Sequence, residues 1–332
     1  MNILYLSAHS VLEYDELLLF HELGFDFFSL GSYINPRTPH DPKRPPIDHD
    51  YNHQLGNIAM VHNAYNLHDE QVAWADVVIA MHIPDFIIKN WDTFKRHNKR
   101  VIWRSIGQSV GHIEEQLKPY REQGMEIVRY SPAEARIPGY IGEDAIIRFY
   151  KDPDEFKGWT GETEEILTFS QDMKNRGDHC HYDIFQDVAA RLPIKAYGPH
   201  NENLGEHNGG VLSYDEMKEK LRTARVFFYT GTVPASYTLS FMEAWMTGIP
   251  IVALGAKGNS SMYNQNTYEV DSLIKNGLHG FVSDDIDQIE TYITQLVKDK
   301  KFAAQIGKQG REEAIRLFDK ELIKKQWRDY LV

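Results

Sequence analysis

The sequence predicts an α/β protein built from two doubly wound parallel sheets, and three observations predict it. Short apolar runs recur along the 332 residues, amphipathic helical patterns separate them, and the polar, turn-rich segment 150–165 divides them into two sets. Continuous apolar strands that alternate with helices are typical of parallel sheets covered on both faces. Because five runs precede that segment and five follow it, two doubly wound domains fit better than one sheet.

The first five runs predict the strands of an N-terminal domain. In order they are "NILYLS" (2–7), "DVVIAM" (76–81), "RVIWRS" (100–105), "MEIVRY" (125–130) and "AIIRFY" (145–150). The amphipathic stretch "LEYDELLLFHELG" follows the first run and predicts a helix. A long segment, residues 34–57, has five prolines between positions 36 and 46 and no apolar period. A loop of that length is usually functional or disordered.

The next five runs predict the strands of a second domain. They are "EILTFS" (165–170), "PIKAYG" (193–198), "RVFFYT" (225–230), "IPIVAL" (249–254) and "HGFVSD" (279–284). Helical patterns lie between them, and a final one, "DKELIKKQWRDYLV", carries aromatic residues that can anchor it. We therefore expect an N-terminal domain at 1–155, a second domain at 156–315 and a C-terminal helix at 316–332.

Composition limits the functions that the chain can have. Hydrophobic residues make up 42% and charged residues 25%, a balance typical of globular proteins. The single cysteine, Cys180, excludes an internal disulfide framework and suits a reducing compartment. We expect neither a signal peptide nor a transmembrane span, and a cytoplasmic location. The net charge of −12 disfavours broad binding to nucleic acid or anionic lipid, although it permits a local basic cleft.

The stretch "SYTLSFMEAWMTGIPIVALG" (236–255) places Glu243 within a segment that otherwise reads as buried. At helical spacing its polar residues share one face, which we expect to line a cleft or solvent. The helix follows a strand through "TGTVPAS", so its first N–H groups offer a site for phosphate. Glu243, one to two turns further in, can accept hydrogen bonds from ribose hydroxyls. The alternative is an ordinary solvated glutamate, but a diphosphate and a ribose together describe a nucleotide-sugar.

This stretch resembles the donor-site motif of retaining GT-B-fold glycosyltransferases of the group 1, or family 4, type. The usual form is E-G-F-G-L-x-x-x-E-A-x-A-x-G-x-P-V-V-A, and "EAWMTGIPIVA" matches its second half. "GVLSYDEMKEKLRTARVFFYTG" and "NGLHGFVSDD" also resemble segments of that family, whereas the N-terminal half resembles it loosely. The resemblance implies two Rossmann-like domains facing a cleft, with the C-terminal helix crossing back to the first. It further implies transfer of a sugar from a nucleoside-diphosphate sugar, with retention and without a required metal or cofactor.

The resemblance also implies roles for individual residues. Glu243 matches the glutamate that holds the ribose, and the backbone at Thr238 and Leu239 matches the diphosphate-binding turn. The family's first glutamate falls at Ala235, so the usual contact with the transferred sugar is absent. The family's Arg and Lys, five residues apart, fall at Gln171 and Arg176. A cation is needed there because departure of a nucleoside diphosphate develops negative charge. The full donor-binding set that we expect, with Arg176 as the catalytic cation, is Glu243, Thr238, Leu239, Ser240, Gln171, Lys174, Gly198, Val211 and Ser10.

Residues after the N-terminal strands are the candidates for the acceptor side. The first loop, "SAHSVLEYDE", lacks the family's glycines, so His9 and Ser10 can offer side-chain hydrogen bonds instead, or simply cap a helix. His82 ends a predicted strand, where ligands bind in doubly wound sheets, and can bind substrate or shuttle a proton as a catalytic residue. A structural histidine is the alternative. The same position argument adds Arg104, Ser105 and Gln108 to the acceptor side.

Three further interpretations bear on chemistry and partners. The histidines of "HCHYD" (179–183) match no zinc-site spacing, so we expect no metal. A first rival function keeps the enzyme class but takes a hydroxylated DNA base as acceptor, with "KNWDTFKRHNKR" (89–100) as a local basic stretch. A second rival is a module that binds a nucleotide-sugar without transferring it, which Ala235 and Gln171 favour. The base, the sugar, the acceptor and the oligomeric state are left open by the sequence.

Overall fold

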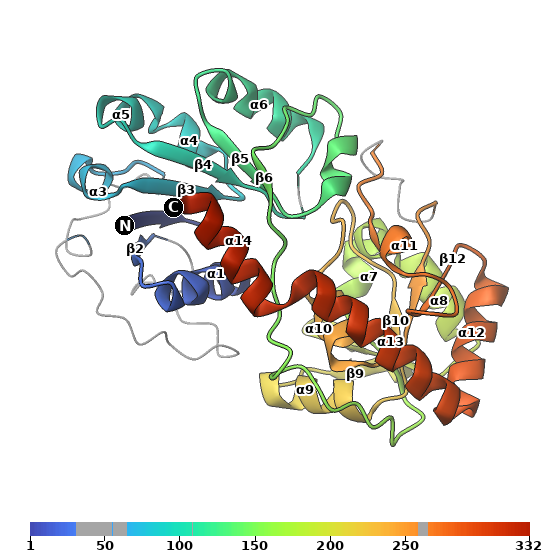
Figure 1. Cartoon of the computed structure of the whole chain (residues 1–332). Helices are drawn as coiled ribbons and strands as arrows, with labels where there is room; N and C mark the ends of the chain where they lie inside the picture. Colours follow the sequence, from blue (N-terminus) through green and yellow to red (C-terminus); the bar gives the residue numbers. More distant parts are fainter. Residues whose placement is uncertain (31–54, 56–64, 108, 258–264) are drawn as a thin grey trace. The chain divides into compact units, whose positions relative to one another are not determined.

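The computed structural model describes residues 1–30, 55, 65–107, 109–257 and 265–332. It forms two compact units, Met1–Phe149 with Ile323–Val332 and Tyr150–Leu322, compared with expected divisions after residues 155 and 315. Each unit contains one six-stranded sheet in which all strands are parallel (Figure 1). The expected loop 34–57 lies outside the described residues, apart from Leu55, as does Gln108.

The sheet of the first unit has the strand order β2-β1-β3-β4-β5-β6. Every residue of β3 is buried, as expected for a strand covered on both faces. The strand order reverses between β1 and β3, so the carboxyl ends of these two strands form a topological switch point. The strands are β1 (Asn2–Leu6), β2 (Asp26–Ser29), β3 (Val77–Met81), β4 (Arg100–Arg104), β5 (Glu126–Arg129) and β6 (Ala145–Ile146).

The helices of the first unit follow its strands in the chain. α1 starts where His9 caps it, since the Leu12 N–H donates to His9 Nδ1 at 3.3 Å. A core cluster that includes Leu4, Val78 and Trp103 packs against these helices. The helices are α1 (Ser10–Glu22), α3 (Asp69–Trp74), α4 (Asp85–Ile88), α5 (Trp91–Arg96), α6 (Gly111–Arg121) and the 3₁₀ turn Pro132–Arg136.

The C-terminal helix, α14 (Lys320–Leu331), returns to the first unit, which contains its residues from Ile323 onward. Trp327 is fully buried there, with its ring edge-on to Phe20 at a centroid distance of 5.4 Å. The Arg104 guanidinium lies 5.3 Å from the centroid of the Trp327 ring. The predicted crossing of this helix to the N-terminal domain is therefore confirmed, and a large buried aromatic side chain fixes it.

The sheet of the second unit has the order β12-β11-β10-β7-β8-β9. Because β7 is the first strand of this unit along the chain, the order reverses between β7 and β10, and their carboxyl ends form a second switch point. The strands are β7 (Ile166–Phe169), β8 (Ile194–Tyr197), β9 (Asn208–Gly210), β10 (Val226–Tyr229), β11 (Ile251–Leu254) and β12 (Phe281–Ser283).

Helices cover both faces of the second sheet. Val226 and Phe228 belong to a core cluster with residues of α8 and α12, whereas the Tyr229 ring contacts Phe241 of α10 at 5.3 Å. Neighbouring side chains of one strand point to opposite faces, so α10 lies opposite α8 and α12. The helices are α7 (Met173–Arg176), α8 (Tyr182–Ala189), α9 (Tyr214–Thr223), α10 (Leu239–Thr247), α11 (Val270–Leu273), α12 (Ile286–Lys298), α13 (Lys300–Phe318) and the 3₁₀ turns Gly177–Cys180 and Glu202–His207.

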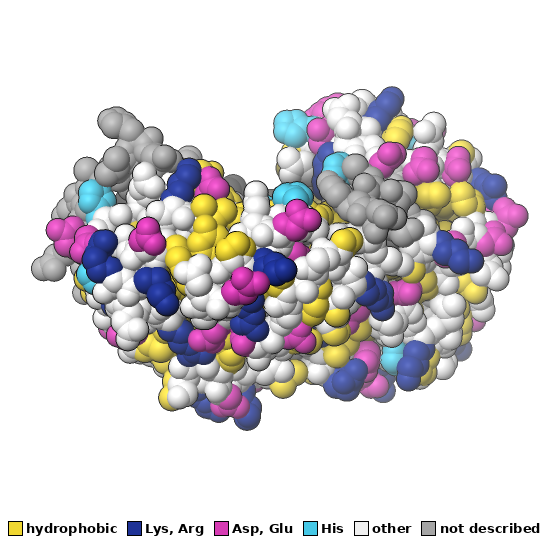
Figure 2. Space-filling view, turned by 90° about the horizontal axis from the view of Figure 1, so that it is seen from above, with side chains coloured by type: hydrophobic (Ala, Val, Ile, Leu, Met, Phe, Trp, Pro, Cys, Tyr) yellow, Lys and Arg dark blue, Asp and Glu magenta, His cyan; other side chains and the backbone are white. Residues whose placement is uncertain are grey.

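Charged side chains are mixed on the molecular face drawn in Figure 2. Basic and acidic side chains of the described residues are interspersed there, with hydrophobic side chains between them. The acidic side chains, which give the chain its net charge of −12, are therefore not gathered into one patch on this face. Such mixing gives little long-range attraction for a polyanion at this face.

Candidate functional site

A pocket of about 140 Å³ opens at the switch point of the second sheet. Residues that end or follow β7 line one side of it, and residues that end or follow β10 line the other. In open parallel sheets this position is where ligands bind. The lining residues are Thr168, Phe169, Ser170, Gln171, Arg176, Tyr229, Thr230, Gly231, Thr232, Thr238 and Ser240.

The lining of this pocket is polar and positively charged. Among the residues that the structure describes, it contains six serine or threonine side chains, one cation, Arg176, and no carboxylate. The Arg176 guanidinium donates from Nη1 to the backbone oxygen of Gln171 at 3.3 Å, a long hydrogen bond. Hydroxyl donors around a fixed guanidinium suit an anion with several acceptor oxygens, such as a phosphate.

The first turn of α10 adds backbone donors to the pocket. Thr238 is the N-cap residue, its side chain makes no capping bond, and its hydroxyl lies 2.9 Å from that of Ser240. The N–H of Thr238 donates to the Tyr229 hydroxyl at 3.1 Å. Burial raises the pKa of Tyr229, so its hydroxyl stays neutral. The N–H groups of the first turn lack partners within the helix and carry the positive end of its dipole, which favours an anion here.

Glu243 lies further along α10 and is buried, with 6% of its surface exposed. The Lys151 ammonium lies 3.1 Å from its carboxylate, and Lys151 is buried as well. Thr247 of the same helix is also buried, and so is Ser236, which lies before α10 and not on its face as expected. The expectation that this face is exposed to solvent is therefore wrong for these three residues, whereas Ser240, expected on the same face, lines the pocket.

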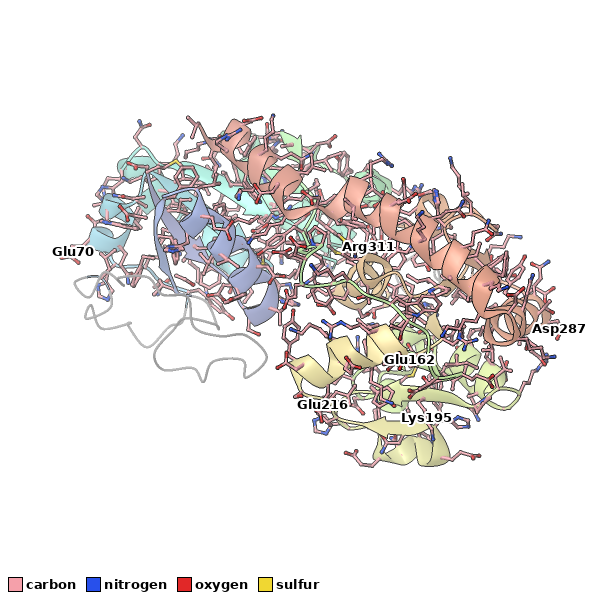
Figure 3. All side chains as sticks on the ribbon, turned by 60° about the horizontal axis from the view of Figure 1, so that its bottom comes forward. Glu70, Glu162, Lys195, Glu216, Asp287 and Arg311 are labelled. Atoms are coloured by element: carbon pink, nitrogen blue, oxygen red, sulfur yellow. The ribbon has the colours of Figure 1, made fainter. Side chains whose placement is uncertain are left out.

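Helix α13 packs closely against α10. Gly307 and Gly310 allow close packing, since a Cβ at Gly307 would lie 2.1 Å from the Gly248 oxygen. Arg311 of α13, labelled in Figure 3, donates from Nη2 to the Pro153 oxygen at 2.7 Å, and its Nη1 donates to two further carbonyls. These contacts fix the helix whose first turn borders the pocket.

The structure brings together four of the residues expected at the donor site. Gln171, Arg176, Thr238 and Ser240 line the pocket, and Leu239 begins α10 beside them. The other expected residues do not line it. Lys174 is exposed on α7, Val211 is exposed after β9, and Gly198 packs against the Ser170 backbone, as described below.

Sequence reasoning missed several residues of this pocket. Thr230 ends the predicted strand "RVFFYT" (225–230) and Thr232 follows it, so the rule that ligands bind at the carboxyl ends of strands could have found both. Tyr229 ends the observed strand β10, and Thr168 lies within β7. Lys151, by contrast, lies far from Glu243 in the sequence, and no local pattern pointed to their pairing.

Three of the residues expected in the first unit, His9, Ser10 and His82, lie close to the ends of neighbouring strands. Ser10 begins α1 after His9, and both follow β1, while His82 follows the neighbouring strand β3. They therefore lie at the switch point of that sheet. His82 has a left-handed backbone (φ 73°), and partial burial lowers the pKa of its imidazole.

Arg104 and Ser105 are fully buried in the first unit. Arg104 donates to Glu16 and to the Ile147 oxygen, each at 2.7 Å, and Ser105 donates to Glu134 at 2.8 Å. These bonds hold the unit together, and their burial leaves no surface for an acceptor. We therefore do not carry these two residues forward as acceptor contacts.

A scan of the described residues finds no cluster of three or more His, Cys, Asp or Glu side chains arranged to hold a metal. In the same parts of the chain, no helix is long and apolar enough to cross a membrane.

A comparison with family models identifies the segment that contains much of this site. Residues 206–313 match the model described as "Glycosyl transferases group 1". This segment is therefore similar to the group 1 glycosyltransferases. It includes β10 and α10, and with them Thr238, Ser240 and Glu243. The resemblance read from the sequence is thereby confirmed. A comparison with the sequences of curated proteins finds no match.

Solved structures resemble the whole chain at low sequence identity. HepE of Anabaena, in complex with UDP and glucose, has a TM-score of 0.69 at 14% identity, covering 100% of this chain and 99% of HepE. Sucrose-phosphate synthase of Thermosynechococcus elongatus has a TM-score of 0.69 at 13% identity, covering 99% and 98%. An alpha-glucosyltransferase in complex with UDP-glucose and DNA containing an abasic site has a TM-score of 0.64 at 11% identity, covering 99% of each chain. These likenesses confirm the predicted GT-B fold. The predicted enzyme class, a glycosyltransferase, is confirmed by the match to the group 1 family model.

Proposed function

We propose that the chain transfers a sugar from a nucleoside-diphosphate sugar to an acceptor, with retention of configuration. The observation that carries the proposal is the pocket at the β7–β10 switch point, where Arg176 and the first turn of α10 converge. That convergence supplies a cation, hydroxyl groups and helix N–H donors in one place. A diphosphate is the ligand group that such a site suits best.

Four residues that line the pocket, together with Leu239 and Glu243 of α10, have roles in this proposal. The N–H groups of Leu239 and Ser240, with the Thr238 hydroxyl, bind the diphosphate. Arg176 stabilises the charge that grows on the leaving diphosphate as the glycosidic bond breaks, and Gln171 supports it. Glu243 binds the ribose hydroxyls, and in doing so shares its carboxylate with Lys151.

We propose UDP-glucose as the first donor to test, because HepE, which has a similar fold, was solved with UDP, with UDP and glucose, and with UDP-glucose. The acceptor binds to the first unit, through His9, His82 and the 34–57 segment. The reaction requires no metal or cofactor, and the protein acts in the cytoplasm. Retention rests on the family resemblance and is tested by the anomeric configuration of the product.

A ligand screen tests the proposal directly. Melting temperatures are measured with UDP-, GDP-, ADP- and TDP-sugars, because a ligand that binds only the folded state raises the melting temperature. One nucleotide class should stabilise the protein, and that donor should then yield free nucleoside diphosphate with an acceptor panel. If no nucleotide-sugar shifts the melting temperature, the proposal fails. Binding without turnover across the panel would favour the rival reading, a non-catalytic module.

The DNA-base acceptor is less well supported by the contacts of residues 89–100. Lys89 pairs with Asp85, Arg96 with Asp69, and Arg100 with Glu126, so much of the positive charge in this stretch is already paired. The Lys99 ammonium donates to the backbone oxygens of α3 and its C-cap. Retention on a DNA column that falls steeply with salt would revive this rival.

A further inference from the structure

Residues 170–176, the β7–α7 loop together with the short helix α7, carry two pocket residues, Gln171 and Arg176, and a buried amide bonds to this segment. Asn201, 1% exposed, follows β8. Its Oδ1 accepts from the Met173 N–H at 3.0 Å, and its Nδ2 donates to the Ser170 oxygen at 2.7 Å. One side chain therefore bonds the loop on both sides of Asp172.

Asp172 has a backbone conformation that needs such support. Its φ and ψ are 48° and 44°, in the left-handed region, which is sterically unfavourable for a residue other than glycine. Its N–H donates to the Pro199 oxygen at 2.9 Å, and its carboxylate accepts from Asn175 at 2.7 Å. The Arg176 N–H in turn donates to the Asp172 oxygen at 3.0 Å. The direction in which Arg176 leaves the loop thus depends on the conformation of Asp172.

The segment that contains Asn201 lies very close to the same loop. A Cβ at Gly198 would lie 2.2 Å from the Ser170 oxygen, and Gly198 has a φ of 146°. The Ser170 N–H donates to the Tyr197 oxygen at 3.0 Å. Glycine at 198 allows this approach, and it brings the amide of Asn201 within reach of both loop arms. This is the role that the structure gives Gly198, in place of the direct donor contact that we expected.

The Arg176 guanidinium has little side-chain support of its own. Within the described parts of the chain it makes one hydrogen bond, to the Gln171 backbone oxygen at 3.3 Å. Both ends of that bond belong to the loop that Asn201 holds. The backbone of the loop, and not a partner side chain, therefore sets the position of the cation.

We propose that Asn201 is a positioning residue for Arg176: it fixes the loop in the conformation that places the guanidinium in the pocket. The inference rests on the proposed function, since it assigns Arg176 to the leaving diphosphate. Displacing a fixed charge costs most where charge develops, so the loss should appear mainly in kcat. Free UDP is bound mainly by α10 and should be held almost as well.

A double-mutant cycle tests the assignment. The variants are Asn201→Ala, Arg176→Ala and the double variant, with UDP-glucose turnover as the kinetic readout and titration calorimetry of UDP as the binding readout. Asn201→Ala should lower kcat by roughly 10- to 100-fold, below the loss of about 100- to 1,000-fold typical of a direct transition-state contact. The Kd of UDP should change by less than about threefold. In the Arg176→Ala background the same substitution should lower kcat by less than about threefold, since residues that act as a unit are not additive.

Two further variants separate positioning from general stability. Asn90→Ala is the matched control, because Asn90 is also a buried amide that uses both ends: it donates to the Tyr65 and Phe86 oxygens and accepts from Leu67. It should lower the melting temperature and leave the kcat of UDP-glucose turnover unchanged. Asn201→Asp keeps the acceptor for Met173 and loses the donor to Ser170, so its kcat should lie between those of the parent and Asn201→Ala. If Asn201→Ala does not fold, Asn201→Asp takes its place in the double-mutant cycle.

The outcomes are distinct. Equal losses of kcat in both backgrounds, or a wild-type kcat in Asn201→Ala, would overturn the positioning role while UDP binding leaves the proposed function intact. Failure of the unsubstituted protein to bind UDP or any other nucleoside diphosphate would overturn the proposed function, and this assignment with it.

Discussion

The Lys151 ammonium lies 3.1 Å from the Glu243 carboxylate, and both side chains are buried in the second unit. The Lys151 N–H donates to the Phe318 oxygen at 2.9 Å, which ties the start of this unit to the end of α13. A buried carboxylate is tolerated when it is paired, so this contact explains how α10 can carry an acid in an apolar segment. The ion pair also gives Glu243 a structural role, in addition to its proposed role in binding the ribose.

Substitution of Glu243 tests its role toward the ribose. Glu243→Gln should weaken UDP binding by about 1.5–3 kcal/mol, the range for hydrogen bonds to a charged group. The unsubstituted protein should bind UDP more tightly than 2′-deoxy-UDP, and Glu243→Gln should bind the two alike. Titration calorimetry with both nucleotides measures this discrimination. Unchanged discrimination in the variant would show that another group reads the ribose.

The same pair predicts an effect on stability that the sequence did not suggest. The sequence reading expects Glu243→Ala to leave the fold intact, because it places the acid on an open face. Removal of one partner of a buried ion pair typically costs about 3–5 kcal/mol. Lys151→Met and Glu243→Leu should therefore each lower the unfolding free energy of the second unit, and the double variant should lose less than the sum. Urea denaturation followed by tryptophan fluorescence measures the three values. Strict additivity would mean that the pair does not couple.

Arg176 tests the assignment of the leaving-group cation. Arg176→Ala should lower kcat by roughly 100-fold or more and weaken UDP binding much less, since the charge on the diphosphate grows in the transition state. Lys174→Ala is the matched control, because Lys174 lies on the same short helix but is exposed and does not line the pocket. Steady-state kinetics and UDP titration of both variants provide the comparison. Equal losses in kcat and affinity for Arg176→Ala would indicate simple ground-state binding.

The fold was largely predictable from the sequence, while the position of the site was only partly so. All ten apolar runs contain a strand, because burial on both faces requires continuous apolar residues. Two edge strands were missed: β2 has four residues, and β9 reads Asn-Gly-Gly, which has no apolar pattern. The helix after "TGTVPAS", with the first turn that we propose binds the diphosphate, followed from local rules.

Contacts between residues distant in the sequence could not be read in this way. The pairing of Lys151 with Glu243 and the bonds from Asn201 to the β7–α7 loop depend on the tertiary fold. For Arg104, a tertiary contact removed a residue that the sequence had placed in a site. Arg104 ends β4, so its position predicted a ligand contact, but it donates to a buried carboxylate and a carbonyl inside the first unit. A strand-end residue lines a site only when its side chain points away from the core.

His82 predicts how stability depends on pH. Burial lowers the pKa of the His82 imidazole below its usual value of about 6.5, so the folded state binds this proton less readily than the unfolded state. As pH falls below about 6.5, the unfolded state gains protons first, and stability decreases. His82→Gln should therefore lose less stability between about pH 7.5 and 5.5 than the unsubstituted protein. Melting temperatures across this range measure the difference, and parallel curves would contradict the prediction.

The long segment 34–57 tests whether donor and acceptor binding are separable. It combines five prolines between positions 36 and 46 with charges of both signs and no periodic apolar pattern, so its length needs a reason other than core packing. It follows the first strand and helix of the chain, on the side that we assign to the acceptor. Shortening "PRTPHDPKRPPIDHD" to a brief Gly-Ser turn should spare UDP-glucose binding and abolish or redirect transfer.

Titration calorimetry with the donor and a transfer assay on the same shortened protein decide between three results. The expected result is an unchanged donor Kd with transfer lost, because the proposed donor contacts come from residues beyond 170. Full transfer activity would show that the segment is a dispensable insertion. Loss of donor affinity would show instead that the segment contributes to the nucleotide site, and that the two binding functions do not belong to separate units.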